Sequence, residues 1–202
     1  MAEAGGEKQE VERKRSVAVL KNSMVLIVLL RLLAFLATAT ATVVMALNKE
    51  TKTFVVATVG NSPITATITA KFQDTPANVY FVIANGMASF HNLLMLGVHF
   101  YGYKLDYRGI RFVAIAILDM TTVALISGGT SAAAFMAEVG KNGNSHARWD
   151  KICDKFESFC NRASGALLAS FIGTALLITI TVISIITVHK QKSSSVNYLA
   201  VP

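Results

Sequence analysis

Two charged residues stand inside long apolar stretches of this sequence, and both are of types that can pair with each other or hold an ion. Arg31 interrupts the run LLRLLAFLATAT at 29–40, and Asp119 is the single acid inside any apolar block. A charge near the middle of a bilayer costs about 2.5–3.5 kcal/mol even on a lenient scale, so such residues usually pair or mark an ion pathway. The sequence therefore raises two hypotheses, an intramembrane ion pair and a route for ions or protons.

Few other groups are suited to chemistry. His91 and Asn92, in ASFHNLLMLGVHFYGY, could line a cavity or bond to a neighbouring helix. The sequence has no phosphate-binding loop, no GxSxG or HExxH motif and no closely spaced set of metal ligands. We therefore expect a protein that is not an enzyme and that uses no cofactor or metal.

Four apolar blocks must position these residues, at about 23–47, 79–100, 112–137 and 165–188. Each is long enough to cross a bilayer as a helix, which takes about 20 residues. The composition agrees, since 53% of the 202 residues are hydrophobic and the mean hydropathy is +0.51. The first block is too long for a cleaved signal peptide, whose apolar core has about 7–15 residues. The predicted fold class is an all-α membrane protein, with a four-transmembrane-helix bundle over 17–190.

Lysine and arginine in the loops indicate the orientation. With both termini inside, the segments 1–22, 101–111 and 189–202 carry ten of these residues, and the outside loops 48–78 and 138–164 carry eight. The polar stretch 1–16 is predicted to be a disordered cytoplasmic tail, and 191–202 a second cytoplasmic tail. The net charge of +7 is thus explained by topology, and we expect no nucleic-acid partner. The N-terminal basic cluster could also contact anionic membrane lipid, but we favour a plain topology signal.

Counting along the helices brings the two intramembrane charges to the same depth. Arg31 is eight residues past Ser23, and Asp119 is eight past Arg111. At 1.5 Å per residue, both lie about 12 Å from the inner surface. An aspartate is too short to reach water from there, and an opposite charge neutralises it. We predict an Arg31–Asp119 bridge between the first and third helices, and we favour a structural latch over an ion pathway.

The first outside loop is predicted to form a β-hairpin. Gly60–Pro63 is a turn signal, and apolar residues alternate with threonines after it, in the period of a half-buried strand. The predicted strands are 53–59 and 64–71. An isolated hairpin is marginally stable in water, so it should pack on its own chain or offer its free edge to another subunit.

The second outside loop holds both cysteines, in WDKICDKFESFC. Cys153 and Cys160 face an oxidising compartment in the predicted topology, where disulfides form. A straight helix would place their Cα atoms about 10 Å apart, beyond the limit of about 7 Å for a bridge. We predict a disulfide with a helix break near Asp154–Ser158; the alternative is two unpaired thiols.

Small residues predict close helix packing. The fourth helix carries a stripe at four-residue spacing, Gly165, Ala169 and Gly173, and the third contains SGGTSAAA at 127–134. Such stripes let helix backbones approach closely in lipid. The stripe could pack within the bundle or form a self-association face.

These features together resemble the CASP-like proteins, the family of the plant Casparian strip membrane domain proteins, which is broadly similar to MARVEL-domain proteins. The family hallmark, a basic residue in helix one and an aspartate in helix three, matches Arg31 and Asp119. The segments YFVIANGMASFHNLLML at 80–96, LDMTTVALISGGTSAAA at 118–134 and WDKICDKFESFC at 149–160 resemble its second helix, third helix and second extracellular loop. The acidic signature that Casparian strip proteins proper carry before helix two is replaced by FQDTPANVYF, so the resemblance points to the first subfamily of the wider group.

The resemblance implies a non-enzymatic protein of the plasma membrane, with both termini cytoplasmic. It implies a scaffold that self-associates as a homo-oligomer, or with paralogues, into a membrane subdomain that positions extracellular wall-modifying enzymes. The alternative is a small transporter or channel that uses Arg31 and Asp119.

Overall fold

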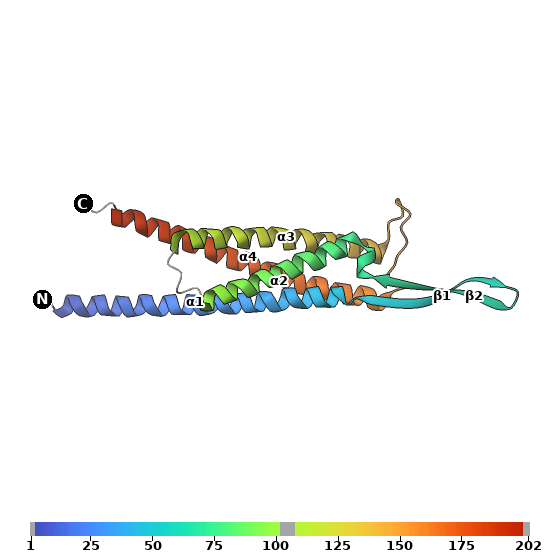
Figure 1. Ribbon diagram of the computed structural model, residues 1–202, viewed down its shortest axis with the longest axis horizontal. Helices are drawn as coiled ribbons and strands as arrows, with labels where there is room; N and C mark the ends of the chain where they lie inside the picture. Colours follow the sequence, from blue (N-terminus) through green and yellow to red (C-terminus); the bar gives the residue numbers. More distant parts are fainter. Residues whose placement is uncertain (1–2, 102–107, 200–202) are drawn as a thin grey trace.

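Four long helices and one hairpin make up the protein (Figure 1). The structure, a computed structural model, describes residues 3–101 and 108–199. Its helices are α1 (Glu3–Ala46), α2 (Pro76–Tyr101), α3 (Arg108–Asn142) and α4 (Glu157–Leu199). Each contains a stretch long and apolar enough to cross a membrane: Met24–Ala46, Pro76–Phe100, Val113–Asn142 and Glu157–Thr187. The predicted fold class, a four-helix membrane bundle with a small hairpin, is confirmed.

The helices extend beyond the apolar blocks, so several predicted boundaries are wrong. Residues 3–16 belong to α1, where a disordered tail was predicted, and α4 continues to Leu199 through most of the predicted tail. At the hairpin end, α3 runs to Asn142, past the predicted 137, and α4 begins at Glu157, before the predicted 165. The reason is cooperativity, because a formed helix extends into flanking polar residues without a new nucleation cost. Of the predicted inner segment 101–111, Tyr101 ends α2 and 108–111 begin α3, while 102–107 lie outside the described residues, as do 1–2 and 200–202.

The bundle interior contains two clusters of buried apolar residues, separated along its length, in which alanine is the commonest residue. The cluster toward the hairpin contains Ala41, Met45, Phe81, Ala133, Ala163, Ala166 and Leu167. The other contains Ala34, Ala88, Ile126, Leu177 and Ile180. Leucines such as Leu29, Leu33 and Leu36 are instead about half exposed, at 52% each. Alanines thus pack between the helices together with a few large apolar side chains, whereas these three leucines of α1 face outward, as expected where small residues let helices approach closely in lipid.

Buried polar side chains link three of the helices. The hydroxyls of Thr130 in α3 and Ser170 in α4 lie 2.6 Å apart, and the Ser170 hydroxyl donates to Asn85 Oδ1 in α2 at 2.8 Å. All three residues are at most 1% exposed. Because the lipid interior offers no water to satisfy these groups, their mutual bonds fix how α2, α3 and α4 are rotated against one another.

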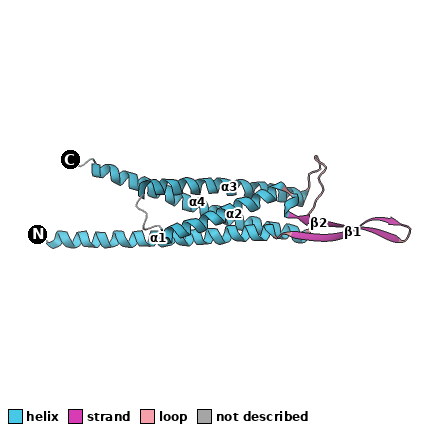
Figure 2. Cartoon of the chain, viewed as in Figure 1, coloured by secondary structure: helices cyan, strands magenta, loops and turns pink. Residues whose placement is uncertain are grey.

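The hairpin consists of β1 (Lys49–Val59) and β2 (Ser62–Lys71), paired antiparallel through a two-residue turn at Gly60 and Asn61. Gly60 has a φ of 61°, a conformation that glycine adopts without steric cost. β1 begins at Lys49, nearer the helices than the predicted 53, and β2 begins at Ser62, nearer the turn than the predicted 64. A register shift between Val55 and Ala57 leaves Val56 unpaired. Figure 2 shows both strands, in magenta, projecting past the end of the helices. The short helix η1 (Phe72–Asp74) then leads into α2.

Candidate functional site

Arg31 and Asp119 meet inside the bundle. Arg31 Nη1 donates to Asp119 Oδ1 at 3.1 Å, and Arg31 Nη2 donates to Oδ2 at 2.7 Å, which makes the pair bidentate. Arg31 is 5% exposed and Asp119 is fully buried. A guanidinium matches both oxygens of a carboxylate in this geometry, so each charge is neutralised without water.

The carboxylate of Asp119 has two further partners that the sequence did not predict. His91 Nε2 lies 2.7 Å from Asp119 Oδ1, and the Ser184 hydroxyl donates to Oδ2 at 3.4 Å. Each oxygen therefore has two partners, which fills the acceptor sites of a carboxylate. Since Arg31, His91 and Ser184 belong to α1, α2 and α4, one acid on α3 is bonded to every other helix of the bundle. We refer to these four residues as the charge cluster.

The two residues proposed as cavity-lining take different positions. His91 has an 11% exposed side chain and is bonded into the charge cluster. Asn92 is fully buried, and its amide donates to the Ala88 carbonyl of its own helix at 2.8 Å. Its Oδ1 has no partner among the described residues. The cavity at the hairpin end is lined by neither residue. The structure thus supports the second reading for His91, a bond to a neighbouring helix.

The structure joins Cys153 and Cys160 by a disulfide, with their Cα atoms 5.6 Å apart. The chain reaches this separation because Cys153 lies in a turn before α4, whereas Cys160 lies in the first turn of the helix. The helix thus begins at Glu157, within the predicted break. The bridge fixes the second loop against the start of α4.

The hairpin base is attached to this disulfide-bonded loop. The backbone N–H of Phe159 donates to Glu50 Oε2 at 2.7 Å, and the Asn48 amide donates to the Phe159 carbonyl at 2.8 Å. The rings of Phe54 and Phe156 meet edge to face with centroids 5.7 Å apart. The bond from Phe159, and then Lys52 at 3.2 Å, lower the pKa of Glu50 from its ordinary value of 4.5.

Acidification is expected to weaken this attachment. The pKa of Glu50 is lower in the folded chain than in the unfolded chain, so its bond is fully present above pH 4.5 and is lost as the pH falls through the lowered pKa. Amide hydrogen exchange at Phe159 should therefore accelerate relative to its intrinsic rate at acid pH. Glu50→Gln keeps an acceptor that does not titrate, and should remove the acceleration of exchange at acid pH. Identical profiles for the two proteins would contradict the prediction.

The predicted small-residue stripe on α4 turns out of the bundle along its length. Gly173 is buried, and a Cβ placed there would lie 2.8 Å from Thr38 Cγ2 of α1. Ala169 is partly buried against the core cluster nearer the hairpin. Gly165 is exposed, and a Cβ there would meet nothing within 4 Å. Gly173 thus packs against α1 within the chain, whereas Gly165 faces outward.

The comparisons with known proteins agree on one family. The Casparian strip membrane protein domain matches residues 21–176. A CASP-like protein 1B1 of Populus trichocarpa is 67% identical over 170 residues, covering 84% of this chain and 87% of the relative. A CASP-like protein 1B2 of Vitis vinifera is 58% identical over 199 residues, covering 96% and 97%. A CASP-like protein 1B1 of Arabidopsis thaliana is 60% identical over 156 residues, covering 77% and 79%. The resemblance to subfamily 1 is confirmed; no solved structure matches the chain.

Proposed function

We propose a scaffolding role for this chain, which belongs to the family of the Casparian strip membrane protein domain. In this role it is a non-enzymatic, multi-pass protein of the plasma membrane with both termini in the cytoplasm. It self-associates, alone or with paralogues, into a membrane subdomain. The hairpin and the disulfide-bonded loop then face the cell wall, where they position wall-modifying enzymes.

The observation that carries this proposal is the exposed apolar face of the hairpin. Directly paired residues of an antiparallel sheet lie on the same face. The register pairs Phe54 with Ala66 and Ala57 with Ile64, so these apolar side chains share one face of the hairpin. On it, Val59, Ile64 and Ile68 are 68%, 47% and 50% exposed. The other face is rich in threonine, with hydroxyl pairs Thr51–Thr69 and Thr53–Thr67 at 3.0 Å. We call the apolar residues of the face opposite these threonines the hairpin face: Phe54, Ala57, Val59, Ile64, Ala66 and Ile68.

The hairpin also leaves an unpaired edge on each strand, because its sheet has two strands in the described chain. Its base is held by α4, but the part beyond Phe54 has no neighbour to cover its apolar side chains. An exposed edge beside apolar side chains favours pairing with another chain. Gly165, the exposed end of the α4 stripe, offers a second lateral contact within the membrane.

The transporter hypothesis is not favoured. In the charge cluster, Asp119 is fully buried and both of its oxygens are bonded to protein groups, which leaves no free ligand for an ion. The cavity at the hairpin end does not have Arg31, His91 or Asp119 in its lining. Among the described residues there is also no group of three metal ligands. These features suit a latch that holds the bundle together.

The self-association proposal is tested by placing a charge on the hairpin face. Ile64→Lys should shift the chain from oligomers to monomers and weaken association at least tenfold, because the lysine would have to be desolvated in the contact. The measurement is the number of photobleaching steps per fluorescent spot for the tagged chain in plant plasma membrane.

The matched control is Thr65→Lys, which adds the same charge one residue along, on the opposite face, where Thr65 is also exposed. It should leave the oligomers intact. A monomeric wild-type chain, or an equal loss of oligomers in the two variants, would refute association through the hairpin face.

A further inference from the structure

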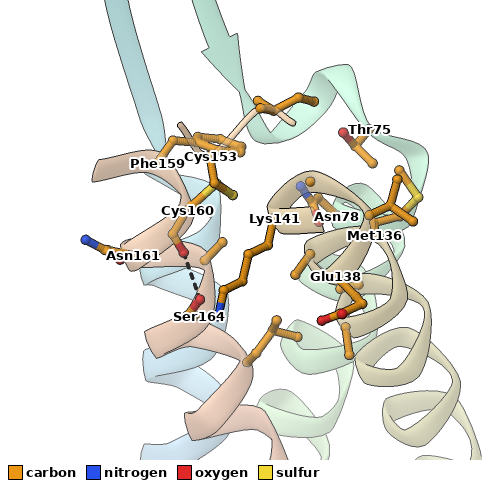
Figure 3. Close-up of a pocket in the computed structure, with 18 of the residues that line it drawn as sticks. Thr75, Asn78, Met136, Glu138, Lys141, Cys153, Phe159, Cys160, Asn161 and Ser164 are labelled. Carbon is orange, nitrogen blue, oxygen red and sulfur yellow. Dashed lines mark hydrogen bonds between the residues drawn. A yellow bond between two sulfur atoms is a disulfide. The ribbon is translucent and has the colours of Figure 1, made fainter. Parts of the chain in front are cut away.

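We propose that the cavity at the hairpin end of the bundle binds a neutral amphiphile with a rigid apolar body and a single hydroxyl, that is, a membrane sterol. The cavity has a volume of about 600 Å³. It lies between α2, α3, α4 and the disulfide-bonded loop (Figure 3). Small-molecule sites in proteins span about 300–1,000 Å³ and are mostly apolar, with a few polar groups that orient the ligand. This cavity has both features.

The walls of the cavity are formed largely by small and apolar side chains. Ala133, Ala134, Ala137 and Ala163 line it, together with Met45 and Leu167. Alanine side chains leave a smooth surface because they carry no flexible groups. A rigid ring system loses little conformational freedom against such a wall, whereas a flexible acyl chain would lose more.

The polarity of the cavity changes with depth in the membrane. Asn78 is the third residue of α2 and Lys141 is the second last of α3, so both lie where the helices leave the membrane. Leu167 is ten residues into α4, about 15 Å deeper. This depth is about half of a hydrocarbon core of about 30 Å. The cavity therefore matches an amphiphile of one leaflet, with its polar end at the surface.

Asn78 provides a specific partner for the ligand. Its side chain points into the region enclosed by α2, α3 and α4 (Figure 3). The residue is 7% exposed and belongs to the cavity lining. A primary amide has both a donor and an acceptor, so it can bond a hydroxyl that enters the cavity in either direction.

The charges of the lining argue against an anionic lipid. Glu138, Asp150 and Glu157 contribute three carboxylates, and Lys141 contributes the one basic side chain among the lining residues. The net negative charge repels a phosphate but has little effect on a neutral hydroxyl. A sterol is therefore favoured over an anionic phospholipid.

The test is photolabelling of the full, disulfide-bonded chain in nanodiscs of zwitterionic phospholipid. The probe is a sterol with a free hydroxyl and a diazirine on its ring system, competed by unlabelled sterol. We expect saturable labelling of peptides from α3 and α4. Ala137→Leu fills the cavity and should weaken binding at least tenfold. Ala124→Leu adds the same volume at an exposed position of α3 outside the cavity, and should have no effect.

The hydroxyl contact is tested separately. Asn78→Leu removes the amide but keeps the branched side-chain shape, and should weaken sterol binding about two- to tenfold, the worth of one hydrogen bond. The methyl ether of the same sterol should show the same loss of affinity for the wild-type protein. This comparison tests the hydroxyl contact even if Asn78→Leu fails to fold. Labelling that Ala137→Leu does not reduce, or that an anionic phospholipid displaces better than sterol, would overturn the inference. Neither result bears on self-association, which the hairpin variants test.

Discussion

Asp119→Leu is expected to prevent most of the protein from folding into a stable bundle. The substitution leaves the Arg31 guanidinium buried at 5% exposure without an opposite charge, and it removes the acceptor for His91 and Ser184. Breaking a buried ion pair by removing one partner costs about 3–5 kcal/mol. Thermal unfolding of purified protein in detergent, together with the fraction delivered to the cell surface, measures the effect.

The double variant Arg31→Met with Asp119→Leu tests whether the buried pair serves as a structural latch and not as an ion pathway. Replacing both members of a buried pair by apolar side chains is often close to neutral, so the double variant should regain most of the lost stability. The remaining loss should reflect the missing acceptor for His91, about 1–3 kcal/mol. A double variant no more stable than Asp119→Leu alone, or a single variant as stable as wild type, would contradict direct pairing.

Gly173→Leu is expected to separate α1 from α4 and to destabilise the bundle by about 1–3 kcal/mol, the typical cost of overpacking. A Cβ at this position would lie 2.8 Å from the Thr38 methyl and 3.6 Å from the Thr38 backbone nitrogen. Thr38 cannot easily rotate away, because its hydroxyl donates to the Ala34 carbonyl at 2.8 Å. The unfolding temperature of the monomer in detergent should fall accordingly.

Gly165→Leu is the matched control, because it adds the same side chain two helical turns away where a Cβ meets nothing within 4 Å. Glycine is about 0.8–1 kcal/mol less favourable in a helix than alanine, and leucine ranks just below alanine, so the substitution gains helix propensity. The control should therefore unfold at the wild-type temperature or above it. If the two variants were equally destabilised, the loss at Gly173 would not come from a clash between α4 and Thr38 of α1.

The sequence predicted the four membrane helices because hydrophobicity over about 20 residues is a strong signal. It predicted their ends poorly because the polar segments beside a membrane helix extend it at little cost, as at residues 3–16 and after 188. The hairpin was predicted from its turn and its alternation. Its outer half is less buried than the alternation indicated, since Ile64 and Ile68 have no neighbour to cover them.

Depth along a helix can be counted from the sequence, but the direction that a side chain faces depends on how the helices are rotated. Counting put Arg31 and Asp119 at one level, and the structure places them in contact. The same count could not show that His91 and Ser184 face the same carboxylate. Nor could it distinguish the two glycines of one stripe, of which Gly173 faces α1 and Gly165 faces the bundle exterior. Tertiary packing decides these roles.

In the role proposed here, this chain forms a membrane subdomain held by lateral contacts. The most direct test is photobleaching recovery of the tagged chain in its native plasma membrane, compared with Ile64→Lys. Wild-type protein should recover slowly and within confined patches, whereas Ile64→Lys should recover quickly and uniformly. Fast, uniform recovery of the wild-type chain would contradict a stable scaffold and would direct attention to flux measurements on Arg31, His91 and Asp119.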